Sequence, residues 1–224
     1  MANESITYQP FGTIKLKRDK TIMRHLFIVL EGVDGTGKTS VAKGLAKSLN
    51  AEYILTPMTP IDDIQVSLAP STSIFLRQYV NDMRDLKVRF CYYLWAVTHA
   101  SHRIREILES RSVVCDRYLS STLAYHAALD PELTEFDVSK LNILRPDYEF
   151  LLTVSDEIEW QRRLGMRPNQ NRGDEFIEKD RKLLRSVEQE YYRLGVEPID
   201  TSQTNVDEVI QIILEKIRGR RLRF

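Results

Sequence analysis

Five short apolar runs are spaced along the chain, and longer stretches with helical periodicity separate them. Apolar runs of this length are typical of strands buried on both faces of a sheet, and helices between successive strands are typical of parallel crossover connections. The pattern therefore predicts an α/β fold built on a parallel sheet. The runs are Leu26–Leu30, Tyr53–Leu55, Ser112–Cys115, Tyr148–Val154 and Val196–Ile199.

The stretches between these runs predict the helices. A helix of about Lys38 to Leu49 follows the first run, and residues 174–194 predict another. Residues 74–110 contain neither glycine nor proline and predict two helices. The second of these carries an aromatic cluster at 89–95, which at helical spacing is typical of core, with a wall that stacks on a base as the alternative.

Composition limits the class of protein. A chain of 224 residues with 42% hydrophobic content can bury a full core, which predicts one α/β domain. The 32 basic and 32 acidic residues balance, so no basic excess favours a nucleic-acid partner. No apolar stretch approaches the ~20 residues of a membrane span, and the N-terminus has no signal-peptide core. We therefore expect a cytoplasmic protein without membrane contact.

The two ends of the chain differ from the middle. Residues 1–24 are polar and predict an N-terminal extension outside the core, and residues 218–224 predict a basic, solvated C-terminal tail. The domain is expected between them, at 25–217. Cys91 and Cys115 match no metal-ligand spacing, and Cys115 ends an apolar run, which favours a buried structural thiol.

A glycine-rich turn, GVDGTGKT at 32–39, lies between the first apolar run and the first predicted helix. Strand, turn and helix in this order form the P-loop pattern, which binds a nucleoside triphosphate. Glycines let backbone N–H groups converge on phosphate oxygens, Lys38 adds a positive charge, and the Thr39 hydroxyl is placed to ligate Mg²⁺. We expect ATP to contact Gly32, Val33, Asp34, Gly35, Thr36, Gly37, Lys38, Thr39 and Ser40.

A second polar group, Asp116-Arg117-Tyr118, comes directly after the third apolar run. Ligands of open parallel sheets lie at the carboxyl ends of the strands, so this triplet should face the same crevice as the P-loop. There Asp116 can act on Mg²⁺ or its water shell and Arg117 can hold a second phosphate, whereas a strand-end salt bridge is the simpler alternative. Asp34 either stabilises the P-loop turn or accepts a hydrogen bond from a sugar hydroxyl.

Residues 165–173 form a polar stretch with glycine at both ends, a candidate lid over the triphosphate. Arginines in such a lid stabilise the charge of a phosphoryl group in transfer, although a solvated basic loop has the same composition. The arginines of this region are Arg162, Arg163, Arg167 and Arg172.

Together these motifs resemble the thymidylate kinase family of nucleoside monophosphate kinases, from about Leu26 to about Ile217. The resemblance implies a P-loop kinase fold: a five-stranded parallel sheet with helices on both faces and a short arginine-bearing lid. It also implies a homodimer that transfers the γ-phosphate of ATP, with Mg²⁺, to a deoxynucleoside monophosphate, usually dTMP. The segments that carry it are FIVLEGVDGTGKTS at 27–40, VVCDRYLSSTLAYHAAL at 113–129, RPDYEFLLTVS at 145–155, the lid at 162–173, DEFIEKD at 174–180 and IDTSQ at 199–203.

The resemblance also assigns roles by position, with IDTSQ near the adenine. The catalytic residues it implies are Lys38, Arg117, Arg163 and Arg167. The metal ligands it implies are Thr39 and Asp116. The acceptor-binding residues it implies are Asp34, Trp95, His99, Arg117, Ser121 and Tyr125.

The chain departs from the family around the acceptor. The family usually has Arg-Glu-Pro-Gly-Gly after the second strand, whereas residues 55–60 read LTPMTP. An acceptor-phosphate arginine is therefore missing, unless Arg77 or another residue replaces it. Trp95 and His99 are the nearest candidates for the pair that usually clasps thymine, His126 stands where glutamine is common, and Glu175 replaces an arginine.

Two alternatives to this function stay open. A kinase for a nucleoside or another small molecule is the first, because fewer phosphate ligands suit an uncharged acceptor. A non-catalytic nucleotide-binding switch is the second, and it has less support because the chain lacks the Asn-Lys-x-Asp stretch of guanine-reading switches.

Overall fold

The computed structural model describes residues 25–57, 71–166 and 180–221. The predicted N-terminal extension, the lid arginines Arg167 and Arg172, and Glu175 lie outside the described residues.

Five parallel strands form one sheet in the described residues, in the order β2-β3-β1-β4-β5. Each strand begins and ends within one residue of a predicted apolar run, so the predicted α/β class with a five-stranded parallel sheet is confirmed. β1 lies at the centre, where Leu30 is paired with Asp116 of β3 and with Phe150 of β4. The strands are β1 (Phe27–Glu31), β2 (Glu52–Leu55), β3 (Val113–Asp116), β4 (Tyr148–Thr153) and β5 (Glu197–Asp200).

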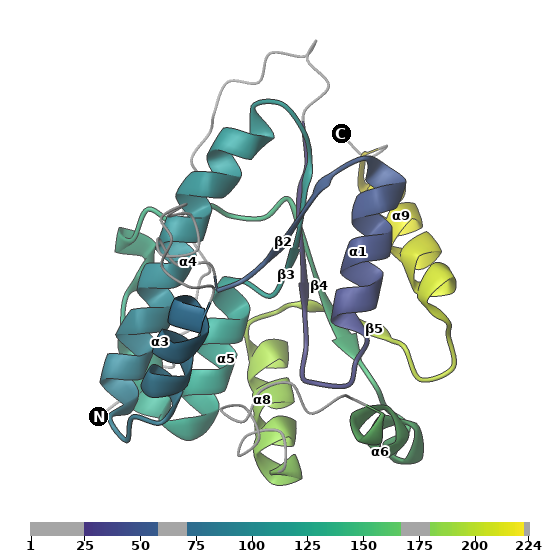
Figure 1. Ribbon diagram of the computed structural model, residues 1–224. Helices are drawn as coiled ribbons and strands as arrows, with labels where there is room; N and C mark the ends of the chain where they lie inside the picture. The colour runs from purple at the N-terminus through teal and green to yellow at the C-terminus, as the bar shows by residue number, and fades with distance from the viewer. Residues whose placement is uncertain (1–24, 58–70, 167–179, 222–224) are drawn as a thin grey trace, which may run out of the picture.

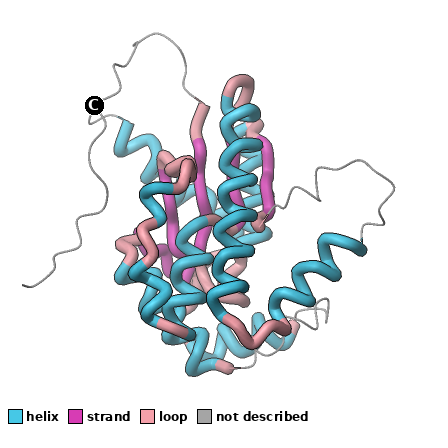
Figure 2. The backbone as a smooth tube through the Cα atoms, turned by 90° about the vertical axis from the view of Figure 1, so that its left-hand side faces the viewer, coloured by secondary structure: helices cyan, strands magenta, loops and turns pink. Residues whose placement is uncertain are grey.

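Helices cover both faces of the sheet (Figure 1). α1 and α9 pack on one face, and α4 and α5 lie on the other, where they face the viewer in Figure 2. None of the helices in the described ranges is both long and apolar enough to span a bilayer. The helices are α1 (Lys38–Leu49), α3 (Ser71–Asn81), α4 (Leu86–Leu108), α5 (Leu119–Leu129), α6 (Glu157–Gly165), α8 (Arg181–Arg193) and α9 (Val206–Arg221), with 3-10 turns η1 (Pro131–Glu135) and η2 (Val138–Lys140).

The central strand shows why the apolar runs are continuous rather than alternating. Ile28 and Leu30 pack into the core beneath α1 and α9, whereas Phe27 and Val29 pack against α4. All four side chains are buried. A strand that is buried on both faces has no position that water favours, so every residue of the run is apolar.

The carboxyl ends of the strands all point to one edge of the sheet, the lower edge in Figure 1. α1 begins there directly after Gly37, which has φ of 85°. α5 begins nearby, after β3, and α6 begins after β4. The fold therefore brings three helix N-termini and the ends of three central strands together, the usual position of a ligand site in an open parallel sheet.

Candidate active site

A cavity of about 620 Å³ opens at this edge of the sheet. Its walls include the P-loop residues Asp34 and Lys38 and, from the segment after β3, Asp116 and Arg117. The prediction that the P-loop and the Asp-Arg-Tyr triplet face one crevice is therefore confirmed. The two segments are distant in sequence but adjacent in space because β1 and β3 are neighbours in the sheet.

The P-loop has a backbone that only glycine tolerates at its start. Gly32 has φ of +140°, and a Cβ there would stand 2.3 Å from the Leu152 carbonyl oxygen. The loop is held from α6 by Trp160, whose indole N–H donates to the carbonyl of Asp34 at 2.7 Å. Lys38 folds back over the turn and donates to the Val33 carbonyl at 2.6 Å. A bound polyphosphate would replace this acceptor of the ammonium group.

Thr39 and Asp116 meet at the floor of the cavity. The Thr39 hydroxyl donates to Asp116 Oδ2 at 2.6 Å, and the Tyr53 hydroxyl lies 3.4 Å from the same oxygen. Mg²⁺ is usually bound by one or two protein oxygens, with water and substrate phosphates completing its shell. A hydroxyl and a carboxylate at this spacing fit such a site. The described residues contain no cluster of three or more His, Cys, Asp or Glu that would suit a metal held by protein ligands alone.

Arg117 crosses from the end of β3 to the P-loop. Its Nη2 donates to Asp34 Oδ1 at 2.6 Å, and its Nη1 donates to the Gly32 carbonyl at 3.1 Å. The guanidinium also lies over the Tyr125 ring, 5.2 Å from its centroid. Burial favours a lower pKa of Arg117, but the nearby Tyr125 and Asp34 raise it overall, so the group stays charged. The Arg117 backbone has φ of 67°, in the left-handed region that non-glycine residues rarely adopt.

The structure shows what the Asp34 side chain contacts within the protein. Its carboxylate forms an ion pair with Arg117 in which both side chains are largely buried. The simpler alternative for the triplet, a salt bridge at the strand end, is thus realised with Asp34 as the partner rather than Asp116. A contact between Asp34 and a sugar stays a prediction.

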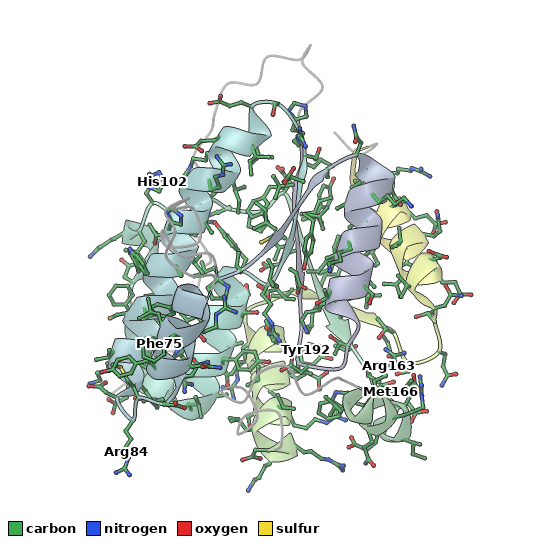
Figure 3. The ribbon with its side chains drawn as sticks, in the orientation of Figure 1. Phe75, Arg84, His102, Arg163, Met166 and Tyr192 are labelled. Carbon is green, nitrogen blue, oxygen red and sulfur yellow. The ribbon has the colours of Figure 1, made fainter. Side chains whose placement is uncertain are left out.

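Arg163 of α6 also lines the cavity, together with Met166, which directly follows the helix (Figure 3). Its Nε donates to Glu159 at 2.7 Å, and its two terminal nitrogens donate to the hydroxyl and the carbonyl of Thr201 at 2.9 and 2.7 Å. Thr201 follows β5 and belongs to the IDTSQ segment. Arg163 therefore joins α6 to the β5 end in this state, and a catalytic role would require it to leave these partners. The exposed Arg162 pairs with the same carboxylate, Glu159.

The residues of α4 that line the cavity are not the ones that the sequence analysis expects to bind the acceptor. Arg89, Tyr93 and Val97, spaced by four residues, line the cavity. Trp95 and His99 are not among the lining residues, and Trp95 is 43% exposed. The prediction that these two side chains clasp the base is not supported by their placement. Two residues along a helix correspond to a rotation of about 200°, so Trp95 lies almost opposite Tyr93.

Ser121 and Tyr125 lie in the cavity wall as expected, on α5. His126 lines the same wall, and its ring stands 5.5 Å from that of Tyr93. Its Nδ1 lies 2.7 Å from the Thr122 carbonyl, which can only accept, so the proton is on Nδ1. Burial lowers the pKa of His126 to about 4, with the Thr122 bond opposing and the charge of Arg89 adding to the shift, so the ring is neutral at neutral pH.

The sequence analysis left open whether Arg77 replaces the missing arginine, and it did not single out Glu31. Arg77 of α3 lines the cavity and donates to the Pro57 carbonyl at 3.1 Å. Glu31, the last residue of β1, is fully buried behind Arg117 and accepts from Tyr118, Ser121 and Tyr191. The sequence signal for Glu31 is a carboxylate that ends a strand buried along its whole length, directly before Gly32.

A triphosphate over Lys38 would direct its terminal phosphate toward Arg117 across one cavity. This arrangement defines a P-loop phosphotransferase with an anionic acceptor. The chain belongs to the thymidylate kinase family, whose model matches residues 30–217. It is therefore a phosphotransferase of the nucleoside monophosphate kinase class, in which ATP is the phosphate donor.

Individual relatives agree with this family. A probable thymidylate kinase from Methanocaldococcus jannaschii is 30% identical over 201 residues, which cover 87% of this chain and 97% of that protein. A probable thymidylate kinase from Pyrococcus horikoshii is 34% identical over 179 residues, which cover 77% and 84% of the two chains. The solved thymidylate kinase from Candida albicans superposes with a TM-score of 0.64 at 18% identity, over 88% of this chain and 93% of that one, which supports the fold.

The ion pair between Asp34 and Arg117 yields a prediction about stability. Asp34→Asn leaves Arg117 without its charged partner in a largely buried position, and we expect a loss of about 1–3 kcal/mol in the free energy of unfolding. Denaturant unfolding of both proteins measures it. The matched control is Glu52→Gln, which makes the same change in the exposed pair between Glu52 and Arg111 and should alter the free energy by no more than ~0.5 kcal/mol. Equal losses in the two variants would contradict the importance of burial.

Proposed function

We propose that the protein phosphorylates dTMP to dTDP with ATP as the donor and Mg²⁺ as the metal. The observation that carries this proposal is the position of Lys38 and Arg117 in one cavity, with Lys38 at the end of the P-loop that follows β1 and Arg117 directly after β3. Two cationic side chains that face each other suit a donor and an acceptor that are both anionic. Membership of the thymidylate kinase family supports dTMP as the acceptor.

The protein has little covalent chemistry to perform in this reaction. An acceptor phosphate oxygen attacks the γ-phosphorus, the bond from that phosphorus to the β-phosphate bridging oxygen breaks, and ADP leaves. The three equatorial oxygens carry negative charge during the transfer. Lys38 neutralises charge on the donor side and Arg117 fixes the acceptor phosphate, so the two phosphates are aligned at little entropic cost during reaction.

Thr39 and Asp116 are the residues that would hold Mg²⁺. A bound ion would supply neutralisation of the negative charge on the phosphates of ATP. Within the protein, Asp116 is oriented by the bonds from Thr39 and Tyr53 described above. We propose that these bonds keep the carboxylate pointed at the cavity rather than at the Lys38 ammonium.

On the acceptor side, we propose that Arg77 takes the place of the missing second-strand arginine. It lies in the cavity wall beside Pro57, where β2 ends, so its guanidinium reaches the region that the missing residue would occupy. Tyr93 takes the place proposed above for Trp95, as the aromatic side chain beside the base. A cationic ligand at this position makes a nucleoside kinase the weaker alternative, because an uncharged acceptor has no use for it.

Several features stay predictions that accompany this function. They are the cytoplasmic location, the homodimer, the domain limits at 25 and 217, and the catalytic use of Arg163 and Arg167.

A substitution at Lys38 tests the reaction. Lys38→Ala removes the positive charge at the donor phosphates, and we expect turnover to fall by roughly a hundredfold to a thousandfold with every acceptor while the protein stays folded. ADP formation is measured across thymidine and the common nucleoside monophosphates. Lys47→Ala, an exposed lysine in the last turn of the same helix, is the control and should keep activity within about twofold. Unchanged turnover in Lys38→Ala, or faster turnover of thymidine than of dTMP by the wild type, would contradict the assignment.

A second substitution tests the metal site. Asp116→Asn weakens a Mg²⁺ ligand and leaves its size unchanged, so the Mg²⁺ concentration that gives half-maximal rate should rise by about tenfold or more. Rates are measured as free Mg²⁺ is varied at saturating ATP and acceptor. Asp82→Asn, at an exposed aspartate of the α3–α4 connection, should leave this concentration unchanged. An Asp116→Asn curve that superposes on the wild type would remove Asp116 from the metal site.

A further inference from the structure

Glu31 is a buried carboxylate that the reaction described above does not use. It ends β1, is 0% exposed, and is not among the residues that line the cavity. A buried charge is costly unless the surrounding structure compensates it with hydrogen bonds. The contacts of Glu31 therefore indicate what the fold gains from keeping it.

The carboxylate fixes the start of α5. Its Oε1 accepts from the backbone N–H groups of Tyr118 at 2.9 Å and of Ser121 at 3.2 Å. These are N–H groups at a helix N-terminus, which lack partners within the helix. Its Oε2 accepts a short hydrogen bond from the Ser121 hydroxyl and a bond from the Tyr191 hydroxyl at 3.3 Å. Glu31 thus binds the peptide that follows Arg117 and the first turn of the helix after it.

Both the backbone and the side chain of Arg117 are connected to this carboxylate. Tyr118, which donates its N–H to Glu31, directly follows Arg117, whose φ of 67° needs support from its neighbours. The Arg117 Nη1 donates to the Ser121 hydroxyl oxygen at 3.5 Å and to the Tyr125 hydroxyl at 3.3 Å. Ser121 therefore lies between the carboxylate and the guanidinium.

The charge of Glu31 is sensitive to its surroundings. Burial, and after it the neighbouring carboxylate of Glu149, raise the pKa of Glu31 to about 7 against the opposing effects of the bonds from Ser121 and the charge of Arg117. The groups that face it are Glu149 of β4, Cys115 of β3, Tyr191 of α8 and Arg117 itself. Glu31 therefore loses its negative charge as the pH falls through about 7.

We propose that Glu31 is a positioning residue for the acceptor: its carboxylate holds Ser121 and the first turn of α5 so that Arg117 presents its guanidinium to the acceptor phosphate. This inference deepens the proposed function and rests on it. The hydrogen bonds of Glu31 itself go to Tyr118, Ser121 and Tyr191, none of which belongs to the P-loop. Loss of the carboxylate should therefore affect the acceptor and leave ATP binding unchanged.

Glu31→Gln tests the proposal with little change in shape. The amide keeps one oxygen for the Tyr118 and Ser121 N–H groups, and its NH₂ can donate to the hydroxyl oxygens, so the variant should fold. We expect the KM for dTMP to rise by about tenfold at pH 8.5 and the KM for ATP to stay within about twofold. A rise of both constants, or of neither, overturns the proposal.

Glu149→Gln is the matched control, because it removes the charge of a neighbouring, partly buried carboxylate that hydrogen-bonds with Ser120 rather than Ser121. It should leave the KM for dTMP within about twofold. If the KM for dTMP rises as much as in Glu31→Gln, the loss of either carboxylate acts by lowering the stability of the protein, and the proposal fails.

The pH dependence separates positioning from packing. Wild-type Glu31 is charged above pH 7 and neutral well below it, and Gln resembles the neutral form. The ratio of the dTMP KM values of Glu31→Gln and wild type should therefore be about ten at pH 8.5 and approach one near pH 5.5. Comparing both proteins at each pH cancels the titration of the substrate phosphate. A ratio that is constant with pH contradicts the proposal.

Amide hydrogen exchange gives a readout that does not depend on turnover. Glu31→Gln should speed exchange of the Ser121 amide, which donates to the carboxylate, and leave the amides of α1 unchanged. Unchanged exchange at Ser121 overturns the positioning role even if dTMP proves not to be the acceptor. If the wild type is inactive with dTMP but Ser121 exchanges faster in Glu31→Gln than in the wild type, the proposed function is refuted and the positioning role of Glu31 is kept.

Discussion

The candidate site depends on the ion pair between Arg117 and Asp34. It joins the end of β3 to the P-loop that follows β1, so the region for the donor phosphates and the region for the acceptor have a fixed relation. The same guanidinium also bonds the Gly32 carbonyl, at the residue whose backbone only glycine tolerates. Since phosphoryl transfer requires two phosphates in line, a rigid link between their binding groups contributes directly to the reaction.

Holding Arg117 in this position costs free energy, and the surrounding residues offset that cost. Arg117 is held with a positive φ and is buried, yet its charge persists because Asp34 and the Tyr125 ring are close. Behind it, Glu31 and Ser121 fix the first turn of α5. The arrangement has the form expected of a functional site: charged groups within the protein that are paired with one another rather than exposed to water.

Much of this could be predicted from the sequence where the information is local. The strand before the P-loop, the turn and the helix after it occur within one residue of their predicted positions, because apolar runs and glycines fix them without reference to distant residues. Lys38, Thr39, Asp116 and Arg117 share a cavity because two adjacent parallel strands end at the same edge. The rotation of α4 could not be predicted in this way, because the aromatic residues of the cluster at 89–95 point in several directions around the helix. The cluster does not say which face meets the cavity, and Tyr93 rather than Trp95 lines it. Glu31 was missed because its partners Ser121 and Tyr191 are 90 and 160 residues away.

The central claim is that donor and acceptor phosphates occupy one continuous cavity between Lys38 and Arg117. The most direct measurement is a crystal structure with a bisubstrate mimic in which a chain of phosphates joins adenosine to thymidine. The account predicts that the phosphate chain runs from the P-loop amides and Lys38 to the guanidinium of Arg117, with thymine beside Tyr93. A mimic whose thymidine half lies on another surface, with no phosphate near Arg117, would contradict the account.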